Sequence, residues 1–365
     1  MHITLVAGTR PNFVKIAPII HALHSAQKQG MEVKYQLVHT GQHYDAVMSG
    51  SFFNDLEIPE PNVNLEVGSG SQSEQTAAIL VKFEKYLLNN PTDLVLVVGD
   101  VTSTMACAIV AKKLTIKLAH VEGGIRSFDN TMPEEINRKV TDSITDYFFT
   151  TSSFANENLA KEGIPAENVF FVGNVMIDTL MRMANKLTPP PIYTEMNLDA
   201  KDYLVVTLHR PANVDNPENL KNLLTAIQQH SNNCPVIFPV HPRTKKTLLE
   251  NGINVPNLKL IDPLSYSEFN FLVKHSFAVI TDSGGITEET TVMGIPCLTL
   301  RDNTERPETC SIGTNELIGT DPSKLPLALD VLFSGNWKKG GIPELWDGKA
   351  AERIVNCLIQ MNKEL

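Results

Sequence analysis

Carboxylates in turns that follow short apolar runs are the first residues in this sequence that could do chemistry. Asp100 comes after the run 94–98 and Gly99, and Glu122 follows the run 119–121, where it enters a pair of glycines. Such groups can act as general acid or general base, or accept hydrogen bonds from hydroxyl groups. Asp100 could equally cap a helix. A glutamate that enters a glycine turn has no obvious capping role, so Glu122 favours function.

Two adjacent glutamates, Glu134 and Glu135, follow Pro133. Proline and acidic residues are favoured in the first turn of a helix, so this position accounts for at least one of them. The other could point towards a ligand as a further acid or base. The spacing does not say which of the two does so.

Cationic groups occupy other turns of the same kind. Arg10 follows a glycine after the first apolar run, and Lys15 lies one helical turn later, whereas His209 and Arg210 leave a run in the second half. Cations at the start of a helix suit an anionic group such as a phosphate. The alternative is a plain turn with solvent-exposed cations. His241, in a similar turn, is interpreted as structural, with a weaker case for a ligand contact.

The most specific local signal is Ser283-Gly284-Gly285, where the apolar run 278–281 gives way at once to a helical pattern. Two glycines let the backbone approach a ligand, and the free N–H groups of a first helical turn can bind a diphosphate. Glu289, in that first stretch of helix, could accept hydrogen bonds from ribose hydroxyls. A tight turn without a ligand is the alternative.

The elements that must position these residues follow a strand–helix alternation. Continuous apolar runs predict strands buried on both faces, and the amphipathic stretches between them predict helices that flank parallel sheets. With 365 residues, two domains are expected. Three prolines at 189–191 predict an extended linker. We therefore expect an α/β protein with two Rossmann-like domains that face a cleft, over residues 1–185 and 200–348, and a C-terminal helix over 349–365 whose placement stays open.

Composition narrows the class of partner. The formal net charge is −10, so nucleic acid and membranes are not expected to bind. The five cysteines form no Cys-x-x-Cys pair, and neither a signal peptide nor a membrane span is recognisable, which predicts a cytoplasmic protein. No Gly-x-Gly-x-x-Gly pattern occurs, so a nicotinamide cofactor is not indicated.

Taken together, seven motifs resemble the non-hydrolysing UDP-N-acetylglucosamine 2-epimerases, in the same order and from residue 3 to beyond 308. They are Gly8-Thr9-Arg10-Pro11 with Lys15, Gly99-Asp100, residues 120–126, residues 133–138, His209-Arg210, residues 281–285 with Glu288-Glu289, and Arg301-Asp302 with residues 304–308.

The resemblance implies a glycosyltransferase-B-like fold, a homodimer, no cofactor or metal, and interconversion of UDP-GlcNAc and UDP-ManNAc. The catalytic candidates that it implies are Asp100, Glu122, Glu134 and His209. The implied substrate-binding residues are Arg10, Lys15, Phe269, Ser283, Gly284, Gly285, Glu289 and Arg306, with His241 a weaker addition. Gln42 and His43 match part of a site where some bacterial relatives bind an activating second UDP-GlcNAc.

This sequence departs from the family pattern in two places. Pro211-Ala212-Asn213 follows His209-Arg210 where many bacterial members have an arginine and a glutamate, and residues 68–71 lack an arginine of the activator site. The segments 40–45 and 127–128 also resemble relatives that act on oxidised or diacetamido UDP-sugars. Alternatives are therefore an epimerase of a modified UDP-HexNAc, a hydrolysing epimerase that releases ManNAc and UDP, a glycosyltransferase, or a non-catalytic UDP-sugar-binding protein.

Overall fold

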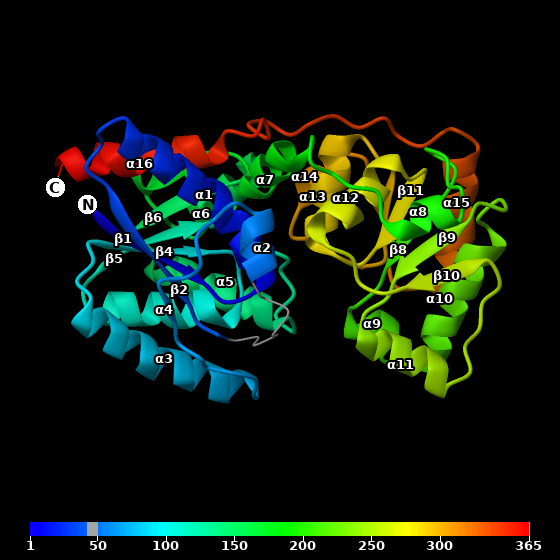
Figure 1. The fold of residues 1–365 in the computed structure, drawn as a ribbon, viewed down its shortest axis with the longest axis horizontal. Coiled ribbons are helices and arrows are strands. Elements are labelled where there is room, and N and C mark those ends of the chain that lie inside the picture. Colours follow the sequence, from blue (N-terminus) through cyan, green and yellow to red (C-terminus); the bar gives the residue numbers. More distant parts are fainter. Residues whose placement is uncertain (42–49, 365) are drawn as a thin grey trace. The chain divides into compact units, whose positions relative to one another are not determined.

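The computed structural model describes residues 1–41 and 50–364 and divides the chain into two compact units. The first unit comprises Met1–Met181 and the C-terminal stretch from Glu344, and the second comprises Arg182–Pro343 (Figure 1). Each unit is built on its own parallel sheet with alternating helices, which confirms the expected α/β class. Among the described residues, no helix is long and apolar enough to span a membrane.

The sheet of the first unit has seven strands in the order β3-β2-β1-β4-β5-β6-β7. All pairings are parallel. The chain turns back between β1 and β4, and such a switch point opens a ligand site at the carboxyl ends of the strands. The strands are β1 (His2–Ala7), β2 (Lys34–His39), β3 (Val63–Asn64), β4 (Leu94–Val98), β5 (Lys117–Val121), β6 (Tyr147–Thr150) and β7 (Val169–Phe171).

Helices cover both faces of this sheet. They are α1 (Arg10–Lys28), α2 (Gly50–Asp55), α3 (Gln72–Asn89), α4 (Thr102–Lys113), α5 (Pro133–Ile144), α6 (Ser153–Lys161), α7 (Val175–Met183) and α16 (Ala350–Glu364), with a 3-10 turn at Ala166–Asn168. One core cluster packs α3 and α4 on the sheet, with Phe83 stacked on Tyr86. The loops that carry the predicted site residues therefore start from strands that are firmly packed in the core.

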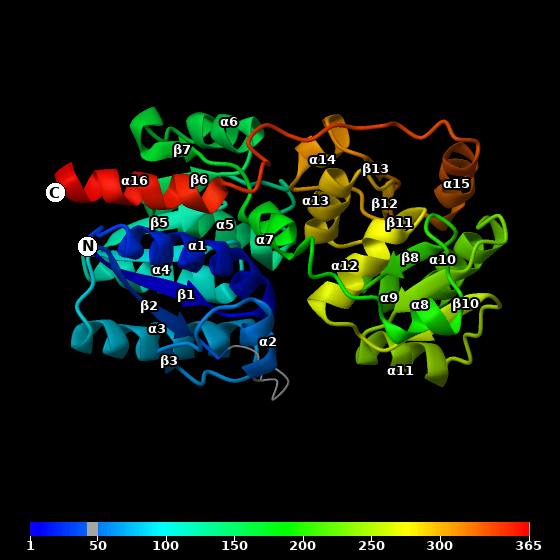
Figure 2. The same cartoon turned by 45° about the horizontal axis from the view of Figure 1, so that its top comes forward.

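The C-terminal helix α16 belongs to the first unit, where it packs along α1 (Figure 2). The Asp178 carboxylate caps it by accepting the backbone N–H groups of Ala350 at 3.1 Å and Ala351 at 2.7 Å. Just before the helix, the indole of Trp346 donates to the carbonyl of Thr151 at 2.9 Å. These contacts settle the placement that the sequence pattern left open.

The sheet of the second unit has six parallel strands in the order β10-β9-β8-β11-β12-β13, so its switch point lies between β8 and β11. The strands are β8 (Leu204–Thr207), β9 (Val236–Pro239), β10 (Leu258–Ile261), β11 (Ala278–Thr281), β12 (Cys297–Thr299) and β13 (Asn315–Leu317). The helices are α8 (Pro191–Glu195), α9 (Pro211–Val214), α10 (Pro217–Gln229), α11 (Pro242–Glu250), α12 (Tyr266–His275), α13 (Gly284–Met293), α14 (Pro307–Ser311) and α15 (Leu325–Phe333), with a 3-10 turn at Pro322–Lys324.

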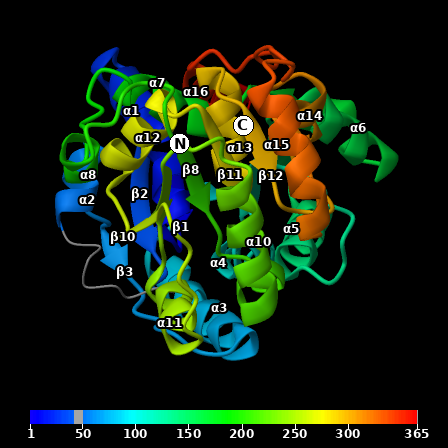
Figure 3. The ribbon, with the colours of Figure 1, turned by 90° about the vertical axis from the view of Figure 1, so that its right-hand side faces the viewer.

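Strand β8 shows why the apolar runs are continuous rather than alternating. Leu204 and Val206 belong to the core cluster of α10 and α15, which pack side by side (Figure 3), whereas Val205 faces the cluster of α8 and α12. Successive side chains of a strand point to opposite faces, so a strand covered on both sides must be apolar at every position.

The three prolines at 189–191 lie inside the second unit rather than at the boundary between Met181 and Arg182. Pro191 starts α8, a position where the missing N–H of proline costs nothing, and Ile192 is buried in the core cluster of this unit. The segment is therefore part of a packed layer, because its flanking residues are apolar enough to be anchored.

Candidate functional site

The loops after β1, β4 and β5 gather the charged residues predicted in the first half. Lys15, on α1, places its Nζ 2.6 Å from Oε2 of Glu122, and the side chains of these residues are 13% and 2% exposed. Glu122 has a φ of 71°, in the left-handed region that residues other than glycine seldom adopt. Such strained backbone persists only where the surroundings enforce it and is common at functional sites.

A buried network holds the turn that contains Glu122. His120 Nδ1 lies 2.6 Å from Asp142 Oδ1, and its Nε2 lies 2.8 Å from the carbonyl oxygen of Gly99. Asp142 also accepts from the N–H of Gly124 at 3.0 Å and from the guanidinium of Arg126 at 2.7 Å. Burial alone would raise the pKa of Asp142, but the charges and hydrogen bonds of His120 and Arg126 lower it. An ionised Asp142 thus ties the glycine turn to the loop before Asp100.

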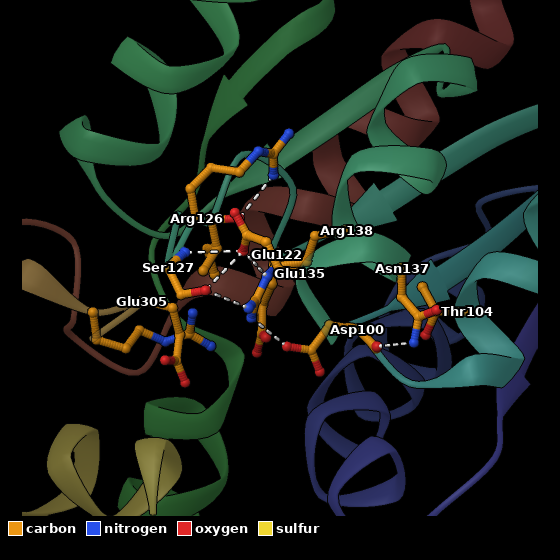
Figure 4. Close-up of polar contacts among 12 residues, drawn as sticks. Asp100, Thr104, Glu122, Arg126, Ser127, Glu135, Asn137, Arg138 and Glu305 are labelled. Carbon is orange, nitrogen blue, oxygen red and sulfur yellow. Dashed lines mark hydrogen bonds and ion pairs between the residues drawn. The ribbon is translucent and has the colours of Figure 1, made fainter. Parts of the chain in front are cut away.

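Asp100 is held by a second cation. Arg138, on α5, donates to Oδ2 of Asp100 at 2.7 Å, and Asn137 donates to the backbone carbonyl of Asp100 at 2.8 Å (Figure 4). The Arg138 side chain is buried, whereas that of Asp100 is partly exposed. Arg138 therefore orients the Asp100 carboxylate, which stays partly exposed to solvent.

Of the two adjacent glutamates, Glu135 is the structural one. It is fully buried and accepts from the N–H of Ser127 at 2.9 Å, from the N–H of Phe128 at 3.0 Å and from Arg138 at 3.0 Å. Glu134 is half-buried, and within residues 1–41 and 50–364 its carboxylate makes no hydrogen bond or ion pair. Glu134 is thus the one available to a ligand, which the spacing did not reveal.

The loops after β1 and β4 pack closely against each other. Asn12 Oδ1 accepts from the N–H groups of Gly8 and Thr9 at 3.1 Å each, and its Nδ2 donates to the carbonyl of Val98 at 3.0 Å. Gly99 has a φ of 69°, and a Cβ there would lie 3.3 Å from Nζ of Lys15. The β1 and β4 loops are thereby fixed against each other. Arg10 is exposed at the first residue of α1.

In the second unit, His209 and Asp282 leave the neighbouring strands β8 and β11. Asp282 is fully buried and lies 2.8 Å from Nδ1 of His209, whose side chain is 54% exposed. Burial alone would raise the pKa of Asp282, but the hydrogen bond and charge of His209, together with donors from Asn213 and Arg210, lower it. The result is an ionised carboxylate beneath an exposed imidazole.

The glycine turn after β11 starts α13, with Ser283 as the residue before the first turn. The side chain of Ser283 does not cap the helix, and a Cβ at Gly284 would collide with Oε1 of Glu305. A side chain at Gly284 would therefore require Glu305 to move. Glu305 is in turn paired with Arg301 at 2.6 Å.

The two acids of α13 have separate partners. Glu288 pairs with Nε of Arg306, whereas Oε1 of Glu289 accepts from the hydroxyl of Tyr266 at 2.8 Å and from Asn270 at 3.4 Å. Burial raises the pKa of Glu289 to about 7, although the hydrogen bonds from Tyr266 and Asn270 oppose this rise. The charge of Glu288 is therefore balanced by Arg306, and Glu289 is held neutral over part of the range below pH 7.

Comparison with known proteins decides what this arrangement belongs to. A family profile described as UDP-N-acetylglucosamine 2-epimerase matches residues 25–359. The chain belongs to this epimerase family. Its members are isomerases, and the resemblance drawn from the seven motifs is thereby confirmed.

Two similar proteins and one solved structure illustrate the breadth of the epimerase family. The chain is 41% identical to a UDP-N-acetylglucosamine 2-epimerase of Methanocaldococcus jannaschii, covering 98% of this chain and 99% of that one. It is 38% identical to a UDP-2,3-diacetamido-2,3-dideoxy-D-glucuronate 2-epimerase of Pseudomonas aeruginosa, covering 99% and 100%. The crystal structure of the M. jannaschii UDP-GlcNAc 2-epimerase with UDP-GlcNAc and UDP matches with a TM-score of 0.87 at 40% identity, covering 99% and 100%.

In this epimerase, two predicted residues lie apart from the charged loops. His241 is exposed and caps α11, since its Nδ1 accepts from the N–H of Arg243 at 3.3 Å. Phe269, on α12, is half-buried against the core cluster of α8 and α12. Gln42 and His43 lie outside the described residues.

Sequence reasoning missed the residues that hold this epimerase's charged groups in place. Asp282 was visible in its motif, directly after a buried strand that neighbours the strand of His209, but only the strand order joins the two. Arg138 and Tyr266 gave weaker signals, because an arginine or tyrosine on an amphipathic helix is usually a surface residue.

Proposed function

We propose that this epimerase interconverts UDP-GlcNAc and UDP-ManNAc by eliminating UDP to give 2-acetamidoglucal and then adding UDP back. The observation that carries the proposal is the pair of carboxylates in the loops after the neighbouring strands β4 and β5, Asp100 and Glu122, each held by its own cation. A base and an acid are both required, because the proton leaves from one face of C2 and returns to the other.

The elimination follows from the chemistry of the sugar. The hydrogen at C2 is not acidic, since no carbonyl is adjacent to that carbon, so direct deprotonation would be too costly. Breaking the C1–O bond as the proton leaves sends the electron pair to the diphosphate, which is a stable anion. On readdition the diphosphate oxygen attacks C1 and a carboxylic acid gives a proton to C2. We assign the proton transfers at C2 to Asp100, Glu122 and Glu134.

The leaving diphosphate needs positive charge and N–H donors. We propose that the first turn of α13, from Ser283 to Gly285, supplies backbone N–H groups, and that His209 and Arg10 supply side-chain donors. Glu289 would accept from the ribose hydroxyls, and Lys15 and Arg306 would keep the neighbouring acids charge-balanced. Phe269 is assigned a ligand contact, and His241 a weaker one.

A modified UDP-sugar is the second candidate substrate. The 38% identity to the P. aeruginosa diacetamido-glucuronate epimerase, close to the 41% for the M. jannaschii protein, supports this alternative. Both substrates share the UDP group and the acetamido group at C2, and therefore the same elimination.

The test is incubation in D2O with each UDP-HexNAc in turn, followed by NMR. UDP-ManNAc with deuterium at C2 from UDP-GlcNAc supports the proposal, and C2 exchange only in the diacetamido uronate assigns the alternative. Free ManNAc with UDP would identify the hydrolysing reaction. Absence of C2 exchange in every UDP-HexNAc would overturn the epimerase assignment for this chain.

We also propose a homodimer in the cytoplasm. The family resemblance supports the dimer, and the five free cysteines fit a reducing compartment. Sedimentation of the purified protein measures its mass against the 40.3 kDa of one chain.

A further inference from the structure

The carboxyl ends of β8 and β11 are locked together beside His209. Thr207 and Thr281 face each other as the last residues of these strands, and their hydroxyl groups share a hydrogen bond of 2.7 Å. Asp282 follows directly, and His209 follows Leu208 on the other strand. The positions of the Asp282 carboxylate and the His209 backbone are therefore fixed by the sheet itself.

Asp282 accepts hydrogen bonds both from nearby backbone N–H groups and from side chains. Its Oδ2 faces the N–H of His209 at 3.1 Å, the N–H of Arg210 at 2.9 Å and Nδ2 of Asn213 at 3.0 Å. Those three donors would fully occupy a purely structural acceptor. The other oxygen, Oδ1, shares the N–H of His209 at 3.1 Å and lies 2.8 Å from Nδ1 of the His209 ring.

The contact with the His209 ring needs a further explanation. An imidazole that is 54% exposed could satisfy its nitrogens with water, and ordering it against a buried group costs side-chain entropy. A carboxylate that is ionised can only accept, so Nδ1 of His209 must donate to it. This leaves Nε2 as the nitrogen that meets a ligand.

We propose that Asp282 is a positioning residue that fixes His209 with its proton on Nδ1 and so presents Nε2 to the departing diphosphate. This inference rests on the proposed epimerase function. When the ring is cationic, Nε2 donates to a diphosphate oxygen as the C1–O bond breaks, and Asp282 balances the charge. Asp282 itself touches no substrate; it acts through His209.

Replacement of Asp282 by asparagine tests the tautomer directly. The N–H of Arg210 and Nδ2 of Asn213 donate to Oδ2 alone and require the amide oxygen at that place, so the amide N–H₂ faces Nδ1 of His209. Nδ1 then accepts, and the ring proton moves to Nε2. The variant retains the shape of the site and gains a neutral donor on Nε2, but it loses the charge that balances an imidazolium.

The first measurement is the ¹⁵N NMR spectrum of histidine-labelled protein, with His209 assigned by its absence in His209→Gln. The wild type should show a protonated Nδ1, and Asp282→Asn should show an unprotonated Nδ1 with the proton on Nε2. A wild-type ring with an unprotonated Nδ1 overturns the proposal. This measurement does not depend on turnover, so it stays valid even if the chain epimerises no UDP-HexNAc, which would overturn only the proposed function.

The second measurement is a double-mutant cycle on turnover of UDP-GlcNAc. Asp282→Asn should lower kcat by roughly 10²-fold while KM and the affinity for UDP stay close to the wild type. In a His209→Ala background the same change should have no further effect, because its target is gone. An equal loss in both backgrounds would show a purely structural role and overturn the proposal.

Asp178→Asn is the matched control for these measurements. Asp178 is also a buried aspartate that accepts two backbone N–H groups, but it caps α16 away from the charged loops. It should leave the His209 spectrum and kcat unchanged. If Asp282→Asn does not fold, the wild-type spectrum alone decides the tautomer.

Discussion

Lys15 and Glu122 form a buried ion pair of 2.6 Å although 107 residues separate them in the sequence. Lys15 comes from the first turns of α1, and Glu122 directly follows β5, which lies two strands away from β1 in the sheet. The pair joins the two sides of the switch point, where the sheet order leaves room for a ligand.

Glu122→Gln should retain UDP binding and lose most turnover. The amide conserves the shape of the side chain but cannot take up or release a proton, and a positioned acid or base contributes roughly 10²- to 10⁴-fold to a rate. Calorimetric titration with UDP and the D2O assay measure the two effects separately. Glu167→Gln, an exposed glutamate of the same unit, is the control. Turnover close to the wild type in Glu122→Gln would remove Glu122 from the mechanism.

Lys15→Met should destabilise the fold because it removes the cation from a buried carboxylate. We expect the free energy of unfolding to fall by about 2 kcal/mol, and most of this loss to be recovered when Glu122→Gln is added. Urea denaturation of the two single variants and the double variant gives the coupling energy between the residues. Strictly additive losses would mean that the pair contributes nothing to stability.

The strand ends could be predicted from the sequence, and the partners of the site residues could not. Asp100, Glu122 and His209 each end a continuous apolar run, so periodicity alone placed them at the carboxyl edge of a sheet. That Arg138, Lys15 and Asp282 are their partners becomes visible only through strand order and helix packing. A polar residue on an amphipathic helix gives no sign of whether it is buried.

At the prolines 189–191, a clear sequence pattern gave the wrong prediction. Three consecutive prolines predict an extended linker, but Pro191 starts α8 and Ile192 is buried in the core cluster. Burial of Ile192 in the core anchors this segment as part of the second unit. The placement of α16 likewise depends on a cap from Asp178, more than 170 residues earlier in the chain.

Glu134→Gln and Glu135→Gln should separate catalysis from structure. Glu135 accepts from two backbone N–H groups and Arg138 in a fully buried position, so its replacement should lower the free energy of unfolding by about 2 kcal/mol or more. Glu134→Gln should keep wild-type stability and lose turnover. Thermal unfolding and the D2O assay on both variants give the comparison. Equal stability of the two variants would contradict the assignment of Glu135 as the structural residue.

Asp178 should make stability depend on pH in an unusual direction. Burial raises its pKa in the folded protein from 3.8 to about 6, against opposing hydrogen bonds from Ala351 and Ala350. The folded state therefore holds a proton that the unfolded state has lost between about pH 4 and pH 6. The contribution of Asp178 to stability is fully present below pH 4 and is lost as the pH rises through 6.

Asp178→Asn removes this titration and isolates it. The difference in unfolding free energy between variant and wild type should shift by roughly 2 kcal/mol in favour of the variant from pH 4 to pH 7. Parallel urea titrations at closely spaced pH values measure the shift. A constant difference across this range would show that Asp178 has an ordinary pKa in the folded state.

Glu289 should make substrate affinity depend on pH near neutrality. Burial raises its pKa to about 7, so the side chain is neutral below this pH and ionised above it. An ionised carboxylate accepts hydrogen bonds from hydroxyl groups more strongly than a neutral acid does. The affinity for UDP-GlcNAc should therefore rise as the pH increases from 6 to 8.

UDP-GlcNAc is the appropriate ligand for this titration, because its diphosphate is doubly esterified and keeps a constant charge over the range. Calorimetry on the wild type and Glu289→Gln gives the comparison, since glutamine has the same length and does not titrate. The glutamine variant should show a flat profile at the lower affinity of the protonated wild type. The same slope in both proteins would assign the pH dependence to another group and remove Glu289 from ribose binding.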